Sequence, residues 1–354
     1  MSARGGILLK DWSQGASVDL RCEEVEQVSE RLSCRAVGAS QTRDTLLEEA
    51  YAGLLQEPRS LPPKYFYDAR GSILFDQICD TPEYYLTRTE DDLLARFAEA
   101  VIGSTRPTSI VEFGSGTARK TRHLLTACVS QGYPIVYAPL DVCREVLLES
   151  SETLLRDYRS LHITALVGDY HAELSRLPTI GGGRLFVFLG STIGNLTQTD
   201  ALTFLHRLRA EMGRSDRLLL GLDRVKDAAI LHAAYNDRAG LTAEFNRNVL
   251  RVLNRDLAAD FSLDGYHHHA CYNPSAQQIE MYLIAKEAQR VTIAAFDRSF
   301  HLDEGDAIQT EISRKFTYSA IDRLLRAGGF RIEEHFEAEN GYFSLVLAGP
   351  NTSV

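Results

Sequence analysis

The sequence predicts an α/β protein in which a parallel sheet, covered by helices on both faces, is joined to a second, smaller α+β unit. Between residues 88 and 225, short continuous apolar runs alternate with helical stretches, and such strands are typical of parallel sheets buried on both faces. The run Gln278–Ile284 instead alternates polar and apolar side chains, which indicates an antiparallel sheet with one face in water. These two patterns in one chain indicate two structural units.

The apolar runs give the order of the expected elements. A helix near residues 87–102 precedes buried strands that are each followed by glycine or aspartate, at 109–113, 135–140, 163–167, 184–189 and 217–222. Two helices are expected over 226–257, ahead of the antiparallel strands. Helix 317–328 and the final strands 330–336 and 342–348 would then return to the edge of the first sheet.

This order divides the chain into three parts. Residues 1–40 show no sustained period and are expected to form an N-terminal extension that is partly ordered at best. Residues 41–87, which begin with a helix, are expected to combine with residues 226–315 into the smaller, substrate-binding unit. Residues 88–225 and 316–354 would form the parallel α/β unit.

Composition excludes several classes of protein. The 354 residues carry a formal net charge of −10 and a pI near 5.5, so the chain would repel phosphate backbones and is not expected to bind nucleic acid. No apolar run approaches the ~20 residues that span a bilayer, and no apolar signal core follows the N-terminus. Six cysteines without a Cys-x-x-Cys pair suit a reduced interior. We therefore expect a soluble, cytoplasmic monomer with no membrane partner.

A nucleotide-type cofactor site is predicted where the first core strand ends. Glu112–Lys120 reads Glu-Phe-Gly-Ser-Gly-Thr-Ala-Arg-Lys, and its glycines allow the backbone to approach a ligand closely. Asp141 follows the next strand, where a carboxylate can accept hydrogen bonds from both hydroxyls of a ribose. Asp169 follows the third strand and is expected beside an adenine.

Three interpretations of this segment differ in their chemistry. A dinucleotide-binding dehydrogenase would need a third glycine to seat a pyrophosphate on the helix N-terminus, but Arg119 occupies that position. S-adenosylmethionine carries a sulfonium and no phosphate, and Glu112 offers a carboxylate near the loop. Glycines and strand-end acids also occur in sheets that bind no nucleotide. The missing third glycine favours S-adenosylmethionine as the cofactor.

Six motifs follow one another between residues 61 and 316. They are Leu61–Ser72 (Leu-Pro-Pro-Lys-Tyr-Phe-Tyr-Asp-Ala-Arg-Gly-Ser), Thr81–Tyr85, Glu112–Thr117, Thr192–Leu196, Phe245–Val249 and Thr310–Phe316. In these motifs and their unbroken order, over about residues 43–350, the chain resembles the histidine Nα-methyltransferases of ergothioneine biosynthesis. The resemblance implies a Rossmann-like class I methyltransferase core, S-adenosylmethionine as methyl donor without a metal, and trimethylation of free L-histidine to hercynine.

The resemblance also implies roles for individual residues. Cofactor contacts are implied for Gly114, Lys120, Asp141, Asp169 and Tyr170. Substrate contacts are implied for Tyr84, Asn195, Tyr235, Met281, Glu311 and Ser313, with Tyr67 and Gly190 at the catalytic centre. Two positions depart from the family's pattern, because Ser191 stands where many relatives have glycine, and Tyr170 stands where phenylalanine is common.

Without the resemblance, the chemistry of the expected substrate residues does not by itself identify a substrate. Glu311 and Ser313 are two apart, so in a strand they point to one face and can hold the N–H and the N of an imidazole. A solvated edge strand could contain the same pair. Asn195 can present its amide to a substrate carboxylate but equally suits a turn. The rings of the site tyrosines can face a quaternary ammonium, which is worth roughly 0.5–2 kcal/mol, or simply pack.

Other functions stay open at this point. Related enzymes methylate tryptophan-derived amines, so a different amine could be the acceptor, although Glu311 and Met281 argue for histidine because an imidazole needs a polar partner. A catalytically silent cofactor-binding module on the same fold is a second alternative. His267–His269 and Cys271 suggest a metal site, but no other cluster of histidine or cysteine completes it.

Overall fold

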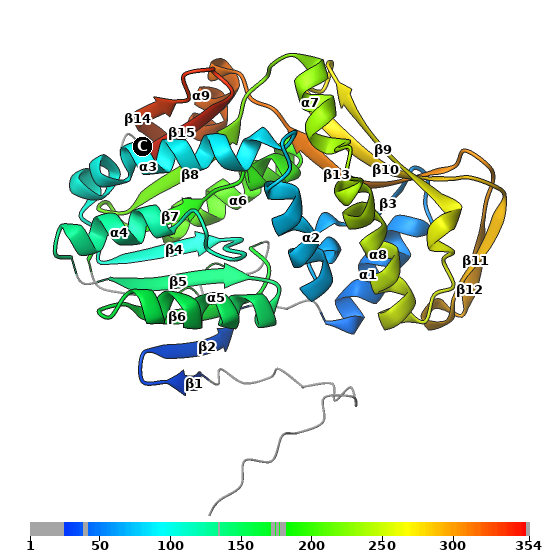
Figure 1. Cartoon of the computed structure of the whole chain (residues 1–354), viewed down its shortest axis with the longest axis horizontal. Coiled ribbons are helices and arrows are strands. Elements are labelled where there is room, and N and C mark those ends of the chain that lie inside the picture. The colour runs from blue at the N-terminus through cyan, green and yellow to red at the C-terminus, as the bar shows by residue number, and fades with distance from the viewer. Residues whose placement is uncertain are drawn as a thin grey trace, which may run out of the picture.

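The computed structural model describes residues 25–37, 42–133, 135–170, 174, 177 and 182–351. These residues form two units that lie side by side, with a large sheet on the left of Figure 1 and a smaller sheet on the right. No helix in the described part of the chain combines the length and the apolar character that a bilayer crossing requires.

Within the described residues, the large sheet has nine strands in the order β1-β2-β6-β5-β4-β7-β8-β15-β14. Its central strands are those that the apolar runs predict: β4 Ser109–Phe113, β5 Val136–Asp141, β6 His162–Val167, β7 Arg184–Phe188 and β8 Arg217–Asp223. They pair in parallel, and β15 (Phe343–Pro350) joins β8 antiparallel, with β14 (Phe330–Glu337) beyond it. The predicted return of the last two strands to this sheet is therefore confirmed.

Helices cover both faces of the large sheet. α3 (Tyr85–Thr105), α4 (Arg122–Ser130) and α5 (Arg144–Asp157) bury their apolar sides against one face. α6 (Gln198–Glu211) and α9 (Tyr318–Ala327) cover the other face. The chain order reverses at β4, which lies between β5 and β7. In such sheets ligands bind beyond the carboxyl ends of the strands at the reversal point.

The smaller unit combines segments from before and after the central strands. Its sheet has the order β3-β13-β10-β9 in the described chain, and a separate hairpin, β11-β12, packs beside it. The bounds of its elements are α1 Arg43–Leu54, β3 Arg59–Ser60, η1 Pro63–Phe66, α2 Ala69–Cys79, α7 Ala228–Tyr235, α8 Leu241–Leu257, η4 Leu263–Gly265, β9 Tyr266–Asn273, β10 Gln278–Ala285, β11 Gln289–Ile293, η5 Ala294–Phe296, β12 Arg298–Leu302 and β13 Ala307–Arg314.

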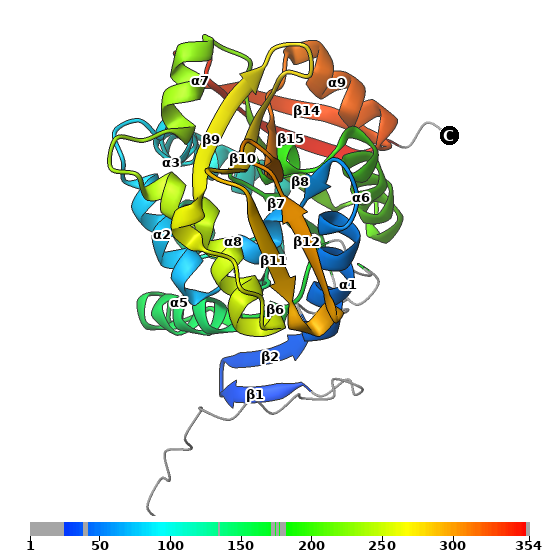
Figure 2. The same cartoon turned by 90° about the vertical axis from the view of Figure 1, so that its right-hand side faces the viewer.

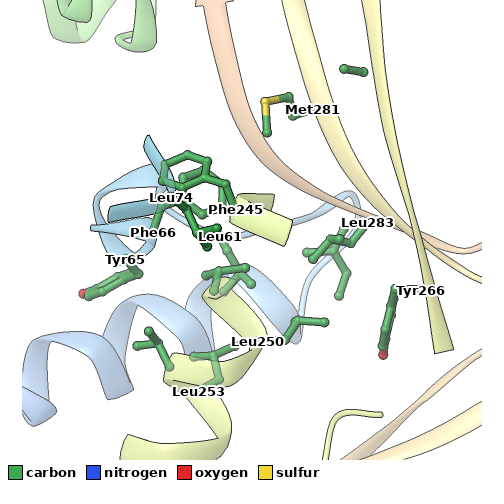
Figure 3. Packing of buried hydrophobic residues seen from close by; sticks show 14 of the residues in the cluster. Leu61, Tyr65, Phe66, Leu74, Phe245, Leu250, Leu253, Tyr266, Met281 and Leu283 are labelled. Carbon is green, nitrogen blue, oxygen red and sulfur yellow. The ribbon is translucent and has the colours of Figure 1, made fainter. Parts of the chain in front are cut away.

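The core of the smaller unit is partly aromatic. The ring centroids of Phe66 and Phe245 lie 4.7 Å apart, and leucines from α8 pack around them (Figure 3). Every second residue of β10 is buried, including Met281 and Leu283, which belong to this core. The alternation that predicted a half-buried antiparallel strand is therefore present.

Two buried asparagines of α8 tie this unit together. The Asn246 amide donates to Tyr282 O at 3.0 Å, and the Asn248 amide donates to Phe66 O at 3.1 Å and to Asp68 at 2.8 Å. Both lie in the motif Phe245–Val249. That motif thus preserves the connection between α8, β10 and the η1–α2 segment.

Part of the N-terminal segment joins the large sheet. β1 (Glu26–Ser29) and β2 (Leu32–Ala36) form a hairpin, and β2 pairs in parallel with β6 at the edge of the large sheet (Figures 1 and 2). Arg31, in the turn, donates hydrogen bonds to carbonyl groups at the end of α5. Residues 1–24 and 38–41 lie outside the described residues. Strands of four and five residues are too short for periodicity to reveal.

Candidate active site

A cavity lies between the two units, beyond the carboxyl ends of β4, β5, β6 and β7. One wall consists of loops of the large sheet, and the other consists of side chains from η1, α2, α7, α8, β10 and β13. Every predicted site residue lines this cavity: Tyr67, Tyr84, Gly114, Lys120, Asp141, Asp169, Tyr170, Gly190, Asn195, Tyr235, Met281, Glu311 and Ser313. The topology therefore brings the cofactor set and the substrate set into one space.

The glycine-rich loop after β4 leaves room for a ligand. Gly114 and Gly116 have φ angles of +67° and +50°, in the left-handed region that glycine adopts without strain. A Cβ at either position would meet no atom within 4 Å, so both glycines face open space. The Asp141 carboxylate accepts a hydrogen bond of 2.8 Å from Gly116 N, which holds the loop against the end of β5.

Glu112 lies in the strand beneath this loop. Its buried carboxylate accepts hydrogen bonds from Thr121 Oγ1 at 2.6 Å and from the Tyr137 hydroxyl. Burial raises the pKa of Glu112 to about 7. Glu112 reaches the cavity wall, but both of its carboxylate oxygens already have partners. Glu112 therefore anchors the segment that follows β4, while its carboxylate lies at the edge of the cavity as an acid near the loop.

A single buried carboxylate holds Lys120 and Gly190. Glu90 of α3 is fully buried and pairs with the Lys120 ammonium. The two oxygens of Glu90 also lie 2.8 and 2.9 Å from Gly190 N, which donates to them. The backbone that follows β7 is thereby fixed against α3, and the charge of Glu90 is compensated.

The residues expected beside the adenine lie at the end of β6. Asp169 forms an ion pair with Lys64 of η1 at 3.1 Å, and Lys64 also contacts Glu49 at 2.8 Å. This contact joins the two units beside the cavity. The Tyr170 ring packs edge-on against Phe188 with centroids 5.2 Å apart, so the tyrosine contributes an aromatic ring where phenylalanine is common.

Four predicted site residues that line the cavity have side-chain polar groups without a hydrogen bond to any described residue. These residues are Tyr67, Tyr84, Asn195 and Glu311. Asn195 ends the short helix η3 (Thr192–Asn195), and Tyr84 immediately precedes α3. Polar groups in protein interiors normally have partners, so these four are available to a ligand.

The cavity shifts the pKa values of these groups. Burial raises the pKa of Glu311 to about 7, and the Lys315 ammonium opposes that rise. Burial, followed by the charge of Glu311, raises the pKa of Tyr67 well above its ordinary value, and burial does the same for Tyr84. The two tyrosine hydroxyls are therefore neutral near pH ~7, whereas Glu311 changes charge there.

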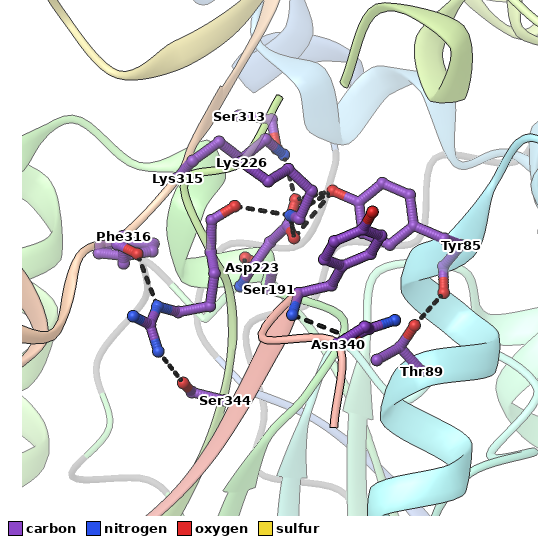
Figure 4. A network of polar contacts seen from close by, with 12 residues as sticks. Tyr85, Thr89, Ser191, Asp223, Lys226, Ser313, Lys315, Phe316, Asn340 and Ser344 are labelled. Carbon is purple, nitrogen blue, oxygen red and sulfur yellow. Dashed lines mark hydrogen bonds and ion pairs between the residues drawn. The ribbon is translucent and has the colours of Figure 1, made fainter. Parts of the chain in front are cut away.

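A charged network holds the other two polar substrate residues, Tyr235 and Ser313. Lys315 Nζ lies 2.9 Å from an Asp223 carboxylate oxygen, and both side chains are fully buried (Figure 4). Lys315 also donates to the Tyr235 hydroxyl and to Ser313 Oγ, each at 2.9 Å. Tyr235 in turn donates to Ser313 at 2.8 Å. Both hydroxyl groups are thus positioned by the protein itself.

Asp223 is held from a second side as well. The Tyr85 hydroxyl donates to its two oxygens at 2.7 and 2.9 Å, and the Lys226 ammonium pairs with it (Figure 4). Although burial opposes the change, the ammonium groups of Lys315 and Lys226 lower the pKa of Asp223. The carboxylate is therefore ionised in the folded protein.

Ser191 departs from the family's glycine without narrowing the cavity. Its φ of +57° lies in the left-handed region that favours glycine. This backbone conformation explains why glycine is common at this position in the family. The Ser191 hydroxyl accepts a hydrogen bond from Asp223 N at 2.9 Å, and the side chain is buried outside the cavity lining. Ser191 therefore supports the end of β8 and does not enter the cavity.

The histidine cluster has a structural contact at its centre. The His268 ring nitrogens lie 2.9 Å from the Asn246 amide and 2.9 Å from Tyr235 O. Across the described ranges, no group of three or more histidine, cysteine, aspartate or glutamate side chains could hold a metal ion.

Glu90, Asp223 and Lys315 are the site-supporting residues that sequence analysis missed. Asp223 ends a core strand, as the predicted ribose-binding aspartate does, and Lys315 follows Ser313 by two residues within a motif. Both positions offered a signal. Glu90 offered none, because its partners are 30 and 100 residues away along the chain.

The fold and the cavity together define a class of protein. A doubly covered parallel sheet, a glycine loop after β4 and an acid at the end of β5 are shared by dinucleotide-binding proteins and by S-adenosylmethionine-dependent methyltransferases with a Rossmann-like class I core. Arg119 in place of the third glycine favours the methyltransferase class. The location of the cavity at the strand reversal agrees with that class.

Comparisons with known proteins identify the family. A family model described as histidine-specific methyltransferase, SAM-dependent, matches residues 46–350. The chain is 46% identical to a histidine N-alpha-methyltransferase of Mycobacterium tuberculosis, over 86% of this chain and 94% of that protein. A histidine N-alpha-methyltransferase of Mycolicibacterium smegmatis is 43% identical, over 88% and 97%. Ergothioneine biosynthesis protein 1 of Neurospora crassa is 32% identical over 82% of this chain and 33% of its own length.

The chain therefore belongs to the family of S-adenosylmethionine-dependent, histidine-specific methyltransferases, as the motifs predicted, and it is an enzyme of that family. The alternative of a catalytically silent module loses its support, because the family model and the similar curated proteins are methyltransferases.

The raised pKa of Glu311 predicts a pH-dependent effect of Glu311→Gln on the ligand-free protein. The folded state binds the proton more tightly than the unfolded chain, so wild type loses stability as pH rises from 4.5 to 7. Glutamine does not titrate and avoids that loss. The free energy of unfolding of Glu311→Gln, relative to that of wild type, should therefore rise by roughly 1–3 kcal/mol between about pH 5 and about pH 8.

Urea unfolding at both pH values measures this advantage. The exposed Glu304→Gln serves as the control and should show no such trend. An advantage of Glu311→Gln that stays constant with pH would contradict the raised pKa.

Proposed function

We propose that this enzyme transfers methyl groups from S-adenosylmethionine to the α-amino nitrogen of L-histidine, and that three transfers yield hercynine in ergothioneine biosynthesis. The observation that carries the proposal is the pair Glu311 and Ser313, which lie in one cavity with the glycine loop. Membership of a histidine-specific family supports the substrate, and the names of the relatives support the pathway.

The chemistry of the cavity suits S-adenosylmethionine. The open space at Gly114 and Gly116 accommodates a ligand against the backbone. Asp141 uses two of its roughly four acceptor positions on backbone N–H groups, so it can also accept hydrogen bonds from ribose hydroxyls. Asp169 and Tyr170 would border the adenine. When bound, the cofactor supplies an electrophilic methyl group on a sulfonium.

The histidine side chain would bind between Glu311 and Ser313. The Glu311 carboxylate accepts a hydrogen bond from the ring N–H, and the Ser313 hydroxyl donates to the other ring nitrogen. An ionised carboxylate makes this contact stronger than a neutral one. Asn195, whose amide has no partner in the described chain, would bind the substrate carboxylate, and Met281 packs beside the ring.

The tyrosines would position the amine and exclude water. Tyr67 and Tyr84 are neutral, so their hydroxyls form hydrogen bonds without acting as anionic bases. Their rings would attract the ammonium product by roughly 0.5–2 kcal/mol. The proton of the amine would leave to water, directly or through a tyrosine hydroxyl. Orientation and desolvation of the free amine would supply much of the rate acceleration. The backbone at Gly190, which Glu90 holds in place, would form part of the wall that orients the amine.

The first prediction from this function concerns the product. Incubation with S-adenosylmethionine and L-histidine should give the mono-, di- and trimethylated amino acid in succession, because each amine intermediate can turn its lone pair toward a fresh methyl donor. Mass spectrometry of a time course, with the other standard amino acids in parallel, measures this. A permanent stop after one methyl group would exclude trimethylation, and faster methylation of tryptophan than of histidine would exclude the proposed substrate.

The second prediction concerns the cofactor. Asp141→Asn should weaken S-adenosylmethionine binding by about tenfold or more, because a hydrogen bond to a charged group is worth roughly 1.5–3 kcal/mol. Calorimetry measures the dissociation constant. Asp157→Asn, at the far end of α5, is the matched control and should leave that constant unchanged. Equal affinities of Asp141→Asn and wild type would remove Asp141 from the cofactor site.

The third prediction concerns specificity. Glu311→Ala should lower kcat/KM for histidine about 10- to 150-fold, from a contribution of about 1.5–3 kcal/mol. The kcat/KM for tryptophan should fall much less. In wild type the apolar ring of tryptophan leaves the buried Glu311 carboxylate without a partner, which is costly, and the variant removes that cost. The measured quantity is the ratio of kcat/KM for histidine over tryptophan.

Glu280→Ala provides the control for Glu311→Ala, because Glu280 lies on the neighbouring strand β10 and does not line the cavity. That variant should keep the wild-type ratio. If the ratio for Glu311→Ala also stays within about twofold of wild type, Glu311 does not read the substrate side chain.

A further inference from the structure

The side chain of Lys315 is fully buried yet lies directly behind a substrate residue. It follows β13 by one position, and its ammonium contacts Asp223, Tyr235 and Ser313 at 2.9 Å each. Lys315 does not itself line the cavity, whereas Tyr235 and Ser313 do. An effect of Lys315 on a bound amino acid would therefore pass through these two hydroxyl groups.

The hydrogen bonds around Ser313 determine the direction of its proton. A serine oxygen can accept two hydrogen bonds and donate one. Ser313 Oγ accepts one from Lys315 and one from the Tyr235 hydroxyl, which is 2.8 Å away. Tyrosine is the more acidic hydroxyl and donates in that pair. No described residue accepts a hydrogen bond from Ser313, so its remaining proton is directed to a ligand in the cavity.

We propose that Lys315 is a positioning residue that makes Ser313 an obligatory hydrogen-bond donor toward the substrate ring. The proposal rests on the proposed function, since it concerns how the histidine side chain is read. Beside Ser313 on the same face of β13, Glu311 is an acceptor when ionised. The two residues thus present one donor and one acceptor.

This pair matches a neutral imidazole, which has one ring nitrogen that accepts and one that donates. An indole has an N–H donor and no acceptor nitrogen, so it would leave the Ser313 proton without a partner in a desolvated site. A buried donor without a partner costs free energy. Lys315 would therefore contribute to the preference for histidine over tryptophan although it contacts neither.

The neighbouring charges keep Lys315 suited to this role. Asp223 lies opposite its ammonium, and although burial opposes the change, that carboxylate raises the pKa of Lys315. Lys315 is therefore a permanent donor. Asp223 retains Tyr85 and Lys226 as further partners, so removal of Lys315 would not leave this carboxylate isolated.

A double-mutant cycle tests the proposal, with wild type, Lys315→Met, Ser313→Ala and the double variant. The kcat and KM for L-histidine are measured at saturating S-adenosylmethionine, together with the dissociation constant of S-adenosylmethionine alone. Each single variant should lower kcat/KM for histidine roughly tenfold, mainly through KM. The loss in the double variant should be well below the product of the two single losses, because Lys315 acts chiefly through Ser313. The affinity for S-adenosylmethionine should stay unchanged.

Lys226→Met is the matched control. Lys226 pairs with the same Asp223 but contacts neither Tyr235 nor Ser313, so its loss should leave KM for histidine within about threefold of wild type. If Lys315→Met fails to fold, the variant that carries both Lys315→Met and Asp223→Asn takes its place in the cycle. This variant removes the two charges of the ion pair together, so neither is left buried without the other.

Two results would overturn the proposal. One is multiplicative losses in the double variant, which would show that Lys315 acts independently of Ser313. The other is an equal loss of affinity for S-adenosylmethionine and for histidine in Lys315→Met, which would indicate general damage to the fold. Failure of the wild type to methylate histidine would instead refute the proposed function, so the two failures are distinguishable.

Discussion

The buried ion pair of Asp223 and Lys315 is the interaction on which the active site depends. Asp223 ends β8 in the large sheet, and Lys315 follows β13 in the smaller sheet, so their contact joins the two units directly behind the cavity. Phe316 N, which donates to Asp223 O at 2.8 Å, reinforces the same junction. Desolvation offsets most of the attraction in a buried ion pair, so its contribution here is geometrical rather than a large gain in stability.

A comparable arrangement supports the cofactor side. Glu90 in α3 compensates Lys120 and binds the backbone at Gly190, much as Lys315 compensates Asp223 and binds Ser313. On both sides a fully buried charge is paired with a group near the cavity. The charged partners settle the positions of the site before any ligand arrives, which reduces the ordering that binding would otherwise require.

The central strands, the antiparallel β10 and the return of β14 and β15 were predictable, because apolar runs and alternation are local patterns. The glycine loop and the acid after β5 were predictable for the same reason. The β1–β2 hairpin was not, since its four and five residues are stabilised by pairing with the distant β6. The partners of Glu112 were not predictable, because Tyr137 reaches its carboxylate from the neighbouring strand β5.

The sequence by itself determined the order of the elements, the location of the cofactor loop and the family, because each depends on residues close together in the chain or on motifs in order. Only the tertiary structure decided which polar groups have partners. Glu112 and Glu311 are both acids within strands, yet one has two hydrogen bonds and the other has none among the described residues. That difference depends on side chains brought together from distant parts of the chain, and no local pattern records it.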